Sequence, residues 1–266
     1  MQGTLGEKIG EGAFADVHTW APGQVVKLFK AGVSHRAVRY EAHLTRTVFA
    51  AGAPAPQVFG EVTVDGRFGL VLQHFDGPTL LHLARSGAVT RQRAGAILAA
   101  LSLALHKTPL PSGVLPLSLR DLIEAMLRED ARGLPPHIAA GILALIERLS
   151  PGDGLCHCDL HPGNVIMTAE GPRLVDWSGA VRAPAALDLA SIHVLLAELA
   201  PEIADDPERP RAVNAAAQSE YARLAGLSEA ALAAAMAPYL PIVRARVAHA
   251  LPDRRARLIP RIEADL

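Results

Sequence analysis

A change in hydrophobic pattern near residue 75 is the feature that most limits how this chain can fold. Before that point, short apolar runs alternate with turns, and Asp65-Gly66 is a favoured pair for a tight hairpin turn. One amphipathic stretch interrupts the strands, where Ser34 can cap the start of a helix and Gly52 can end it. The sequence therefore predicts a β-rich lobe that contains a single helix.

Helical periodicity takes over after Phe75 and holds for most of the remaining chain. Only the stretch around residues 155–177 returns to short apolar strands, which we expect to form a hairpin. We predict an α+β fold with a small antiparallel-sheet lobe, 1–75, and a large, mainly helical lobe, 76–266. The predicted helices are Thr90–His106, Ser118–Arg132, Pro136–Leu149 and most of Asp188–Leu266.

Composition narrows the class of protein. Lys and Arg total 26 against 27 Asp and Glu, so the formal charge of -1 indicates neither a nucleic-acid nor a membrane partner. Two cysteines make no disulfide framework, and the first residues have no signal-peptide pattern. The longest apolar run, Ala94–Leu105, is too short to span a bilayer. We expect a soluble, cytoplasmic protein, and the sequence does not indicate its oligomeric state.

Two features of the first lobe suggest a phosphate site. Gly10 and Gly12 lie between two predicted strands, where backbone N–H groups can approach an anion, although glycines are also common in hairpin turns. Lys27 lies within the next strand, and Glu41 lies on the predicted helix. These two residues are either solvated surface side chains or an ion pair that positions phosphate oxygens, with nearby arginines as rival partners for Glu41.

The most specific signal is HCDLHPGNVI followed by LVDWSGA. Asn164 and Asp176 provide oxygen ligands of the kind that Mg²⁺ prefers, and Asp159 could accept a proton from a reacting hydroxyl group. Turn formation explains the residue types but not their joint order with Lys27 and Glu41. We therefore predict Asp159 as catalytic and Asn164 and Asp176 as metal ligands.

Together these motifs resemble the aminoglycoside phosphotransferase and choline kinase-like family, which shares its fold with protein kinases. The resemblance runs from IGEGAFADV to DLA at Asp188–Ala190 and implies a bilobal kinase-like fold that uses ATP or GTP with Mg²⁺. It implies that Lys27 and Glu41 form the phosphate-positioning ion pair and that Gln73–Phe75 is the adenine-binding hinge. It also implies that Asp188 braces the catalytic loop.

The sequence departs from the family pattern at three places. Ala15 replaces the third glycine of the fullest glycine loop, and Cys158 stands where the family usually has glycine. Trp177-Ser178 follows the metal aspartate in place of Phe-Gly. None of these changes removes a predicted ligand.

The histidines and cysteines beside the catalytic loop form an alternative metal site. His157 and His161 could form a zinc cluster with Cys156 and Cys158, but adjacent residues of a strand point to opposite faces. We expect His157 to brace the backbone, His106 to pack at a helix end and Cys158 to be an inert thiol.

The spacing after Asp176 and the charges of the C-terminal region bear on the acceptor. Only Trp177–Leu187 separates Asp176 from Asp188, which leaves no room for the activation segment of a protein kinase, so we expect a small hydroxylated molecule. Five carboxylates in Glu198–Glu208 could line a pocket for a polycationic aminoglycoside, or form a solvated acidic loop. Because the final helices are rich in arginine, we expect a neutral acceptor or a metabolite. A regulator that binds nucleotide without turnover is a further alternative.

Overall fold

The computed structural model describes residues 3–110, 117–129 and 133–266, and these residues form two compact units. Unit 1 comprises the chain up to Thr79 together with Asn164–Ser178, and unit 2 comprises Leu80–Gly163 and Gly179–Leu266. Packing thus groups Asn164–Ser178 with the sheet, although the sequence assigns this segment to the range 76–266.

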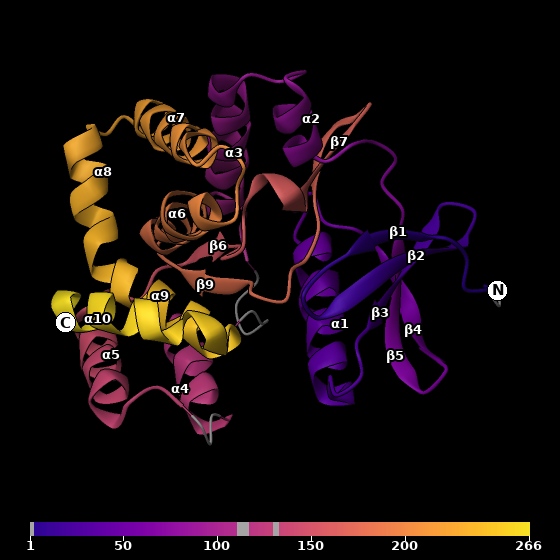
Figure 1. The fold of residues 1–266 in the computed structure, drawn as a ribbon, viewed down its shortest axis with the longest axis horizontal. Coiled ribbons are helices and arrows are strands. Elements are labelled where there is room, and N and C mark those ends of the chain that lie inside the picture. The colour runs from indigo at the N-terminus through magenta and orange to yellow at the C-terminus, as the bar shows by residue number, and fades with distance from the viewer. Residues whose placement is uncertain (1–2, 111–116, 130–132) are drawn as a thin grey trace. The chain divides into compact units, whose positions relative to one another are not determined.

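Unit 1 is built on a five-stranded antiparallel sheet in the order β1-β2-β3-β5-β4 (Figure 1). The predicted Asp65-Gly66 turn joins β4 to β5, and both residues have the positive φ that a tight hairpin requires. The strands are β1 (Lys8–Glu11), β2 (Ala15–Ala21), β3 (Gln24–Phe29), β4 (Val58–Val64) and β5 (Arg67–Gln73).

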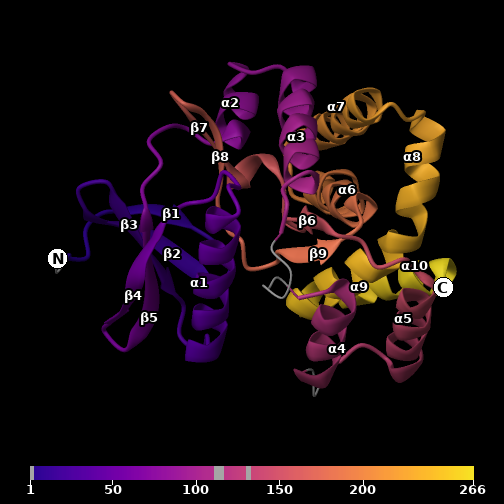
Figure 2. The same ribbon diagram turned by 180° about the vertical axis from the view of Figure 1, so that it is seen from behind.

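Helix α1 (His35–Ala50) lies against this sheet and contacts β4 and β5 (Figures 1 and 2). Ser34 caps its start as predicted, because the hydroxyl oxygen accepts a hydrogen bond from the Ala37 amide. Its buried face meets β2, β3 and β5 in a small core formed by Ala15, Phe29, Val38, Ala42 and Leu70.

A second hairpin, β7 (Val165–Thr168) and β8 (Gly171–Leu174), completes unit 1. The Met167 amide donates to the Pro78 carbonyl, and the Leu174 amide donates to the Pro54 carbonyl. These bonds attach the hairpin to unit 1 although it lies far along the chain.

Unit 2 is mainly helical, and α6 contacts helices on several sides. Thr90 and Ser228 cap α3 and α8 by accepting from Arg93 and Ala231 amides. Gly95 lets α3 and α7 approach closely, because an added Cβ would lie 2.5 Å from the Ala216 Cβ. The helices are α2 (Leu80–Ser86), α3 (Arg91–His106), α4 (Leu119–Glu129), α5 (Pro136–Arg148), α6 (Ala185–His193), α7 (Glu208–Ala225), α8 (Glu229–Met236), α9 (Leu240–Ala250) and α10 (Arg255–Asp265).

The structure differs from the sequence prediction in two details. Helix α2 was absent from the prediction, and β6 (Gly154–Cys156) pairs with β9 (Val181–Ala183) and not with the next strand along the chain. The end of the predicted helix Ser118–Arg132 lies outside the described residues. Among those residues no single helix could span a membrane by length and hydropathy; α7 and α8–α9 pass such a test only as a pair bent by 107°.

Candidate active site

An ion-pair triad formed by Lys27, Glu41 and Asp176 lies within unit 1. The Lys27 Nζ on β3 lies 2.6 Å from Glu41 Oε1 on α1 and 3.1 Å from Asp176 Oδ1 after β8. The side chains of Lys27 and Glu41 are only 12% and 6% exposed, so this is not a solvated surface pair. Arg36 and Arg39, the rival partners for Glu41, are both exposed. The structure therefore brings together three of the residues that the sequence singles out.

The charge of Lys27 is held in place by its two partners. Burial lowers the pKa of the Lys27 ammonium, but Glu41 and Asp176 outweigh burial and raise that pKa above its ordinary value. A permanent cation at this position, with one more carboxylate than it can neutralise, suits a site that binds phosphate oxygens together with a metal ion.

Asp176 and Asn164 lie at the same end of the β7–β8 hairpin. Asn164 directly precedes β7, and its carbonyl accepts a hydrogen bond from the Val175 amide at 3.0 Å. Both side chains offer hard oxygen atoms, the donor chemistry that Mg²⁺ takes in proteins, and substrate phosphates and water normally complete its shell. The donor set therefore fits the predicted Mg²⁺.

The backbone around Asp176 is fixed in an unusual conformation. Asp176 has φ +64°, which is uncommon for a residue other than glycine. Ser178 Oγ donates to Asp176 Oδ1 at 2.9 Å, and the fully buried Trp177 ring donates from Nε1 to the Leu174 carbonyl at 3.0 Å. Trp177-Ser178, a departure from the family pattern, thus anchors this turn from both sides.

Asp159 lies in unit 2, on the loop that follows β6. Its side chain is 40% exposed, and its carboxylate lies 3.9 Å from the His161 ring. Its amide donates to Nδ1 of the fully buried His157 at 3.3 Å, so His157 braces the loop backbone as predicted. The carboxylate is therefore held on an ordered loop and is accessible to a substrate hydroxyl.

A buried chain of polar groups supports that loop. Asp188 Oδ1 accepts from the Cys158 amide at 2.7 Å, which is the bracing contact that the family resemblance implies. Asp188 Oδ2 lies 3.2 Å from His106 Nε2, and His106 Nδ1 lies 2.8 Å from the Tyr221 hydroxyl. The sequence missed the link from His106 to Asp188 and Tyr221, which joins distant parts of the chain.

Cys158 has the conformation that explains its usual replacement by glycine. Its φ is +60°, in the left-handed region that glycine adopts without strain. Burial raises the pKa of Cys158 to about 11, so the thiol is protonated at neutral pH, which fits the expected inert residue. Among the described residues, no group of three or more His, Cys, Asp and Glu side chains could hold a metal ion. The zinc alternative therefore has no support there.

The glycine turn and the hinge are ordered parts of unit 1. Gly10 lies opposite Val17 in the sheet, and the Gly12 amide donates to the Ala15 carbonyl at 2.8 Å. Neither glycine has a positive φ, so the turn itself does not require them. Their predicted role in approaching phosphate stays a prediction.

The predicted hinge residues Gln73 and Phe75 line a hollow of about 420 Å³. The amides of Gln73 and His74 are used within the protein, whereas the described part of the chain offers no partner to the Phe75 amide. Arg173 lies 5.9 Å from the centre of the Phe75 ring. The predicted role of this segment in binding adenine stays a prediction.

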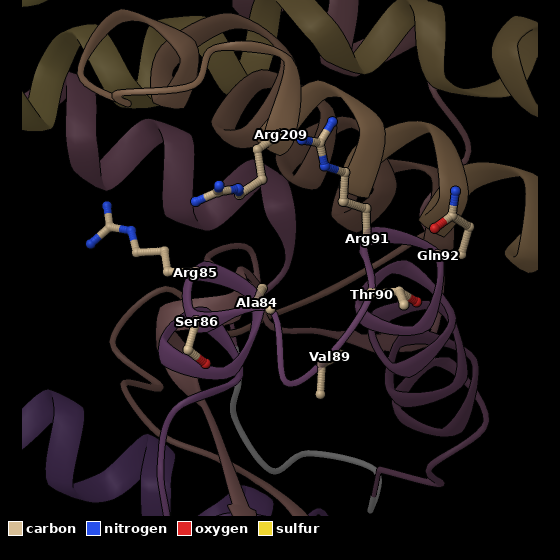
Figure 3. A pocket seen from close by; sticks show the side chains of 9 residues that line it. Ala84, Arg85, Ser86, Val89, Thr90, Arg91, Gln92 and Arg209 are labelled. Carbon is tan, nitrogen blue, oxygen red and sulfur yellow. The ribbon is translucent and has the colours of Figure 1, made fainter.

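A second hollow, of about 410 Å³, lies at the turn between α2 and α3 (Figure 3). Arg85, Arg91 and Arg209 lie around it, and Asp206 binds Arg91 at 2.8 Å and Arg209 at 3.7 Å. All residues around this hollow are at least partly exposed. It is a basic surface depression in unit 2.

The acidic segment Glu198–Glu208 is largely neutralised. Glu198 lies 2.7 Å from both Arg244 and Arg261, and these arginines outweigh the effect of burial and lower the pKa of Glu198. Four of its five carboxylates pair with arginine, and the remaining pairs are Glu202 with Arg254 and Arg257, Asp206 with Arg91 and Arg209, and Glu208 with Arg211.

Comparison with known proteins gives one family and one fold. The sequence model of the phosphotransferase enzyme family (APH) matches residues 13–227. No curated protein sequence matches the chain at a significant level. The five-stranded sheet followed by a mainly helical region is shared with several solved structures, which confirms the kinase-like α+β fold.

Three of these structures illustrate the range of proteins that share the fold. A candidate fructosamine-3-kinase from Haemophilus somnus has a TM-score of 0.66 at 13% identity, covering 99% of this chain and 92% of that one. A choline/ethanolamine kinase family protein from Mesorhizobium loti has 0.60 at 17% identity, covering 99% and 84%. Aminoglycoside phosphotransferase APH(3'')-Id from Streptomyces rimosus, in complex with ADP and streptomycin, has 0.53 at 18% identity, covering 85% and 90%. At these identities the likeness shows the fold alone.

Proposed function

Because this chain belongs to the phosphotransferase enzyme family, we propose that it transfers the terminal phosphoryl group of ATP or GTP to a hydroxyl group of a small molecule. The observation that carries this proposal is the ion-pair triad in which the buried Lys27 contacts both the buried Glu41 and the partly exposed Asp176. A lysine that served stability alone would need one carboxylate. The second carboxylate leaves excess negative charge beside the end of the β7–β8 hairpin, where Asn164 precedes β7 and Asp176 follows β8.

Each predicted residue has a distinct task in this reaction. Lys27 binds phosphate oxygens of the nucleotide, and Glu41 keeps its ammonium group in place. Asn164 and Asp176 would hold Mg²⁺, which when bound neutralises charge on the phosphates. Asp159 orients the acceptor hydroxyl and takes its proton as the phosphoryl group arrives. The similar Streptomyces rimosus protein is in complex with ADP, which supports a nucleotide as the donor.

The electrostatics of unit 2 argue against a polycationic acceptor. An aminoglycoside needs several unpaired carboxylates around it, whereas those of Glu198, Glu202 and Asp206 each bind arginine. Releasing them would leave the arginines unpaired, at a cost that a weak surface contact could not offset. This pairing supports a metabolite as the acceptor and disfavours drug resistance as the native role.

The experiment is Mg²⁺-dependent transfer from ATP and from GTP to a panel of hydroxylated acceptors. The panel contains aminoglycosides, macrolides, choline, amino-alcohols, sugars and thiamine. Asp159→Asn is the inactive variant, and Asp153→Asn is the matched control, because Asp153 is exposed and lies just before β6. We expect one acceptor to be phosphorylated by the unmodified protein and by Asp153→Asn but not by Asp159→Asn.

One outcome would contradict the transfer reaction, and another would contradict only the metabolite as acceptor. If nucleotide binds and no acceptor in any class is phosphorylated, the protein acts as a nucleotide-binding regulator. Heat protection by kanamycin-type drugs, together with their phosphorylation, would instead make it a resistance enzyme.

A further inference from the structure

One arginine of the C-terminal helices reaches the catalytic loop. Arg246 on α9 donates from Nη2 to the Gly179 carbonyl at 3.4 Å. A Cβ on Gly179 would lie 3.3 Å from that nitrogen and 3.3 Å from the His157 carbonyl, so glycine lets the guanidinium and the loop backbone approach each other. The charge of Arg246 also opposes the effect of burial on the pKa of Cys158. Arg246 therefore lies beside the residue that directly precedes Asp159.

The other arginines nearby in sequence are bound differently. Arg244 and Arg261 bind Glu198, while Arg254 and Arg257 bind Glu202. Within the described part of the chain Arg246 has no carboxylate partner, although it is half-buried. A guanidinium carries five N–H donors, and the long bond to the Gly179 carbonyl and the contact with the Cys158 thiol leave several of them for a ligand.

The carboxylates near Arg246 are engaged by other groups or assigned to the reaction. The nearby buried carboxylate, Asp188, is already bound by the Cys158 amide and His106. Asp159 is reserved for the acceptor hydroxyl by the proposed mechanism. What remains for the rest of the acceptor is a half-buried cation whose planar, forked donors match an oxyanion.

We propose that the acceptor carries an anionic group, a carboxylate or a phosphate, and that Arg246 binds it while Asp159 receives the hydroxyl. This inference rests on the proposed phosphotransferase function. It makes Arg246 a specificity-determining residue, and it places the substrate among hydroxy acids or hydroxy phosphates. A purely structural Arg246 would brace Gly179 and would affect every acceptor equally.

The test compares acceptors that differ in charge but share a carbon skeleton. One set contains glycerate, glycerol 3-phosphate, glycerol and serinol, and a second contains gluconate, glucose 6-phosphate, glucose and glucosamine. Transfer from ATP is measured with the unmodified protein, Arg246→Gln and Arg246→Lys. The carboxylate and phosphate members separate the two kinds of anion.

We expect an anionic member to be phosphorylated. Arg246→Gln should raise its KM by about ten-fold or more, because a charge-assisted pair is lost, while kcat and the KM for ATP change little. Arg246→Lys keeps the charge without the fork and should raise the KM less. This second variant also keeps the test valid if the glutamine variant folds poorly.

Arg85→Gln is the matched control. Arg85 is exposed and lies at the α2–α3 hollow, and its substitution removes the same charge from unit 2 (Figure 3). It should leave the KM unchanged; a rise with Arg85→Gln and none with Arg246→Gln would overturn the proposal. A different result is that the protein phosphorylates neutral or aminated members, with Arg246→Gln either leaving the KM values unchanged or changing them equally for all acceptors. That result would overturn the anionic acceptor and leave the phosphotransferase function standing. If ATP binds but no acceptor of these two sets or of the earlier panel is phosphorylated, both the anionic acceptor and the phosphotransferase function are overturned.

Discussion

Lys27 and Asp176 lie 3.1 Å apart, which joins the candidate phosphate site to the candidate metal site within unit 1. The strand β3 supplies the lysine, and the turn after β8 supplies the aspartate. Since Lys27 also binds Glu41, one buried cation links three segments that are distant in the sequence. Its removal should therefore affect both stability and nucleotide binding.

Replacing Lys27 by Met should separate these two effects. The change leaves Glu41 buried without its cation, and we expect a loss of about 3 kcal/mol in the free energy of unfolding, measured with urea. Adding Glu41→Gln should recover most of that stability but none of the ATP binding. If Lys27→Met alone were as stable as the unmodified protein, the buried pair of Lys27 and Glu41 would not stabilise the fold.

Asp188 should contribute to the stability of the fold in a pH-dependent way. Although burial raises its pKa, the bonds from His106 and the Cys158 amide hold the pKa of Asp188 below its ordinary value. A group with a lowered folded-state pKa stabilises the fold above its unfolded pKa, about 3.9, and this stability disappears as the pH falls through the folded value. Asp188→Asn should thus be less stable by about 2 kcal/mol at pH 7, and the difference should shrink below pH 4. A constant difference would contradict the pKa shift.

Cys158 can be tested through its backbone conformation. At φ +60° a side chain costs about 1 kcal/mol, which glycine avoids. Cys158→Gly should therefore unfold at a higher urea concentration than Cys158→Ala, which removes the same sulfur but keeps the strain. Equal stability of the two variants would exclude strain at this position.

The thiol of Cys158 should react slowly with iodoacetamide. With a pKa of about 11, only about one thiol in a thousand is ionised at pH 8, compared with roughly a quarter for an unperturbed cysteine. The rate, followed by mass spectrometry, should keep rising up to pH 11. A plateau near pH 8.5 would contradict the raised pKa.

Arg244 and Arg261 bind the same carboxylate but differ in exposure. The side chain of Arg244 is 10% exposed and also pairs with Asp265, whereas Arg261 is 42% exposed. Arg244→Gln should lower the free energy of unfolding by about 3 kcal/mol, and Arg261→Gln by less than about 1 kcal/mol. Equal losses would show that burial does not govern these pairs.

Local signals in the sequence predicted much of the fold. Ser34 caps α1, and Asp65-Gly66 forms the turn between β4 and β5. These features depend on residues within a few positions of one another, so spacing and residue type are sufficient to find them. The meeting of Lys27 with Glu41 followed from motif order and not from local chemistry.

Local signals of this kind could not predict the long-range contacts. The pairing of β6 with β9 and the polar chain through His106, Asp188 and Tyr221 join segments that only tertiary packing brings together. The sequence shows that the final helices contain arginines and that Glu198–Glu208 contains carboxylates. It does not show which of these residues pair. Arg246 could be distinguished from its neighbours only by its position beside Gly179.

The most direct test of the phosphotransferase function is to measure product and nucleotide affinity in the same Mg²⁺-containing samples of the unmodified protein and Asp159→Asn. Because Asp159 acts on the hydroxyl proton and not on the nucleotide, both proteins should bind ATP with the same affinity, and the variant should form phosphorylated acceptor at least about a hundred-fold more slowly. Equal rates of product formation by the two proteins would contradict the account.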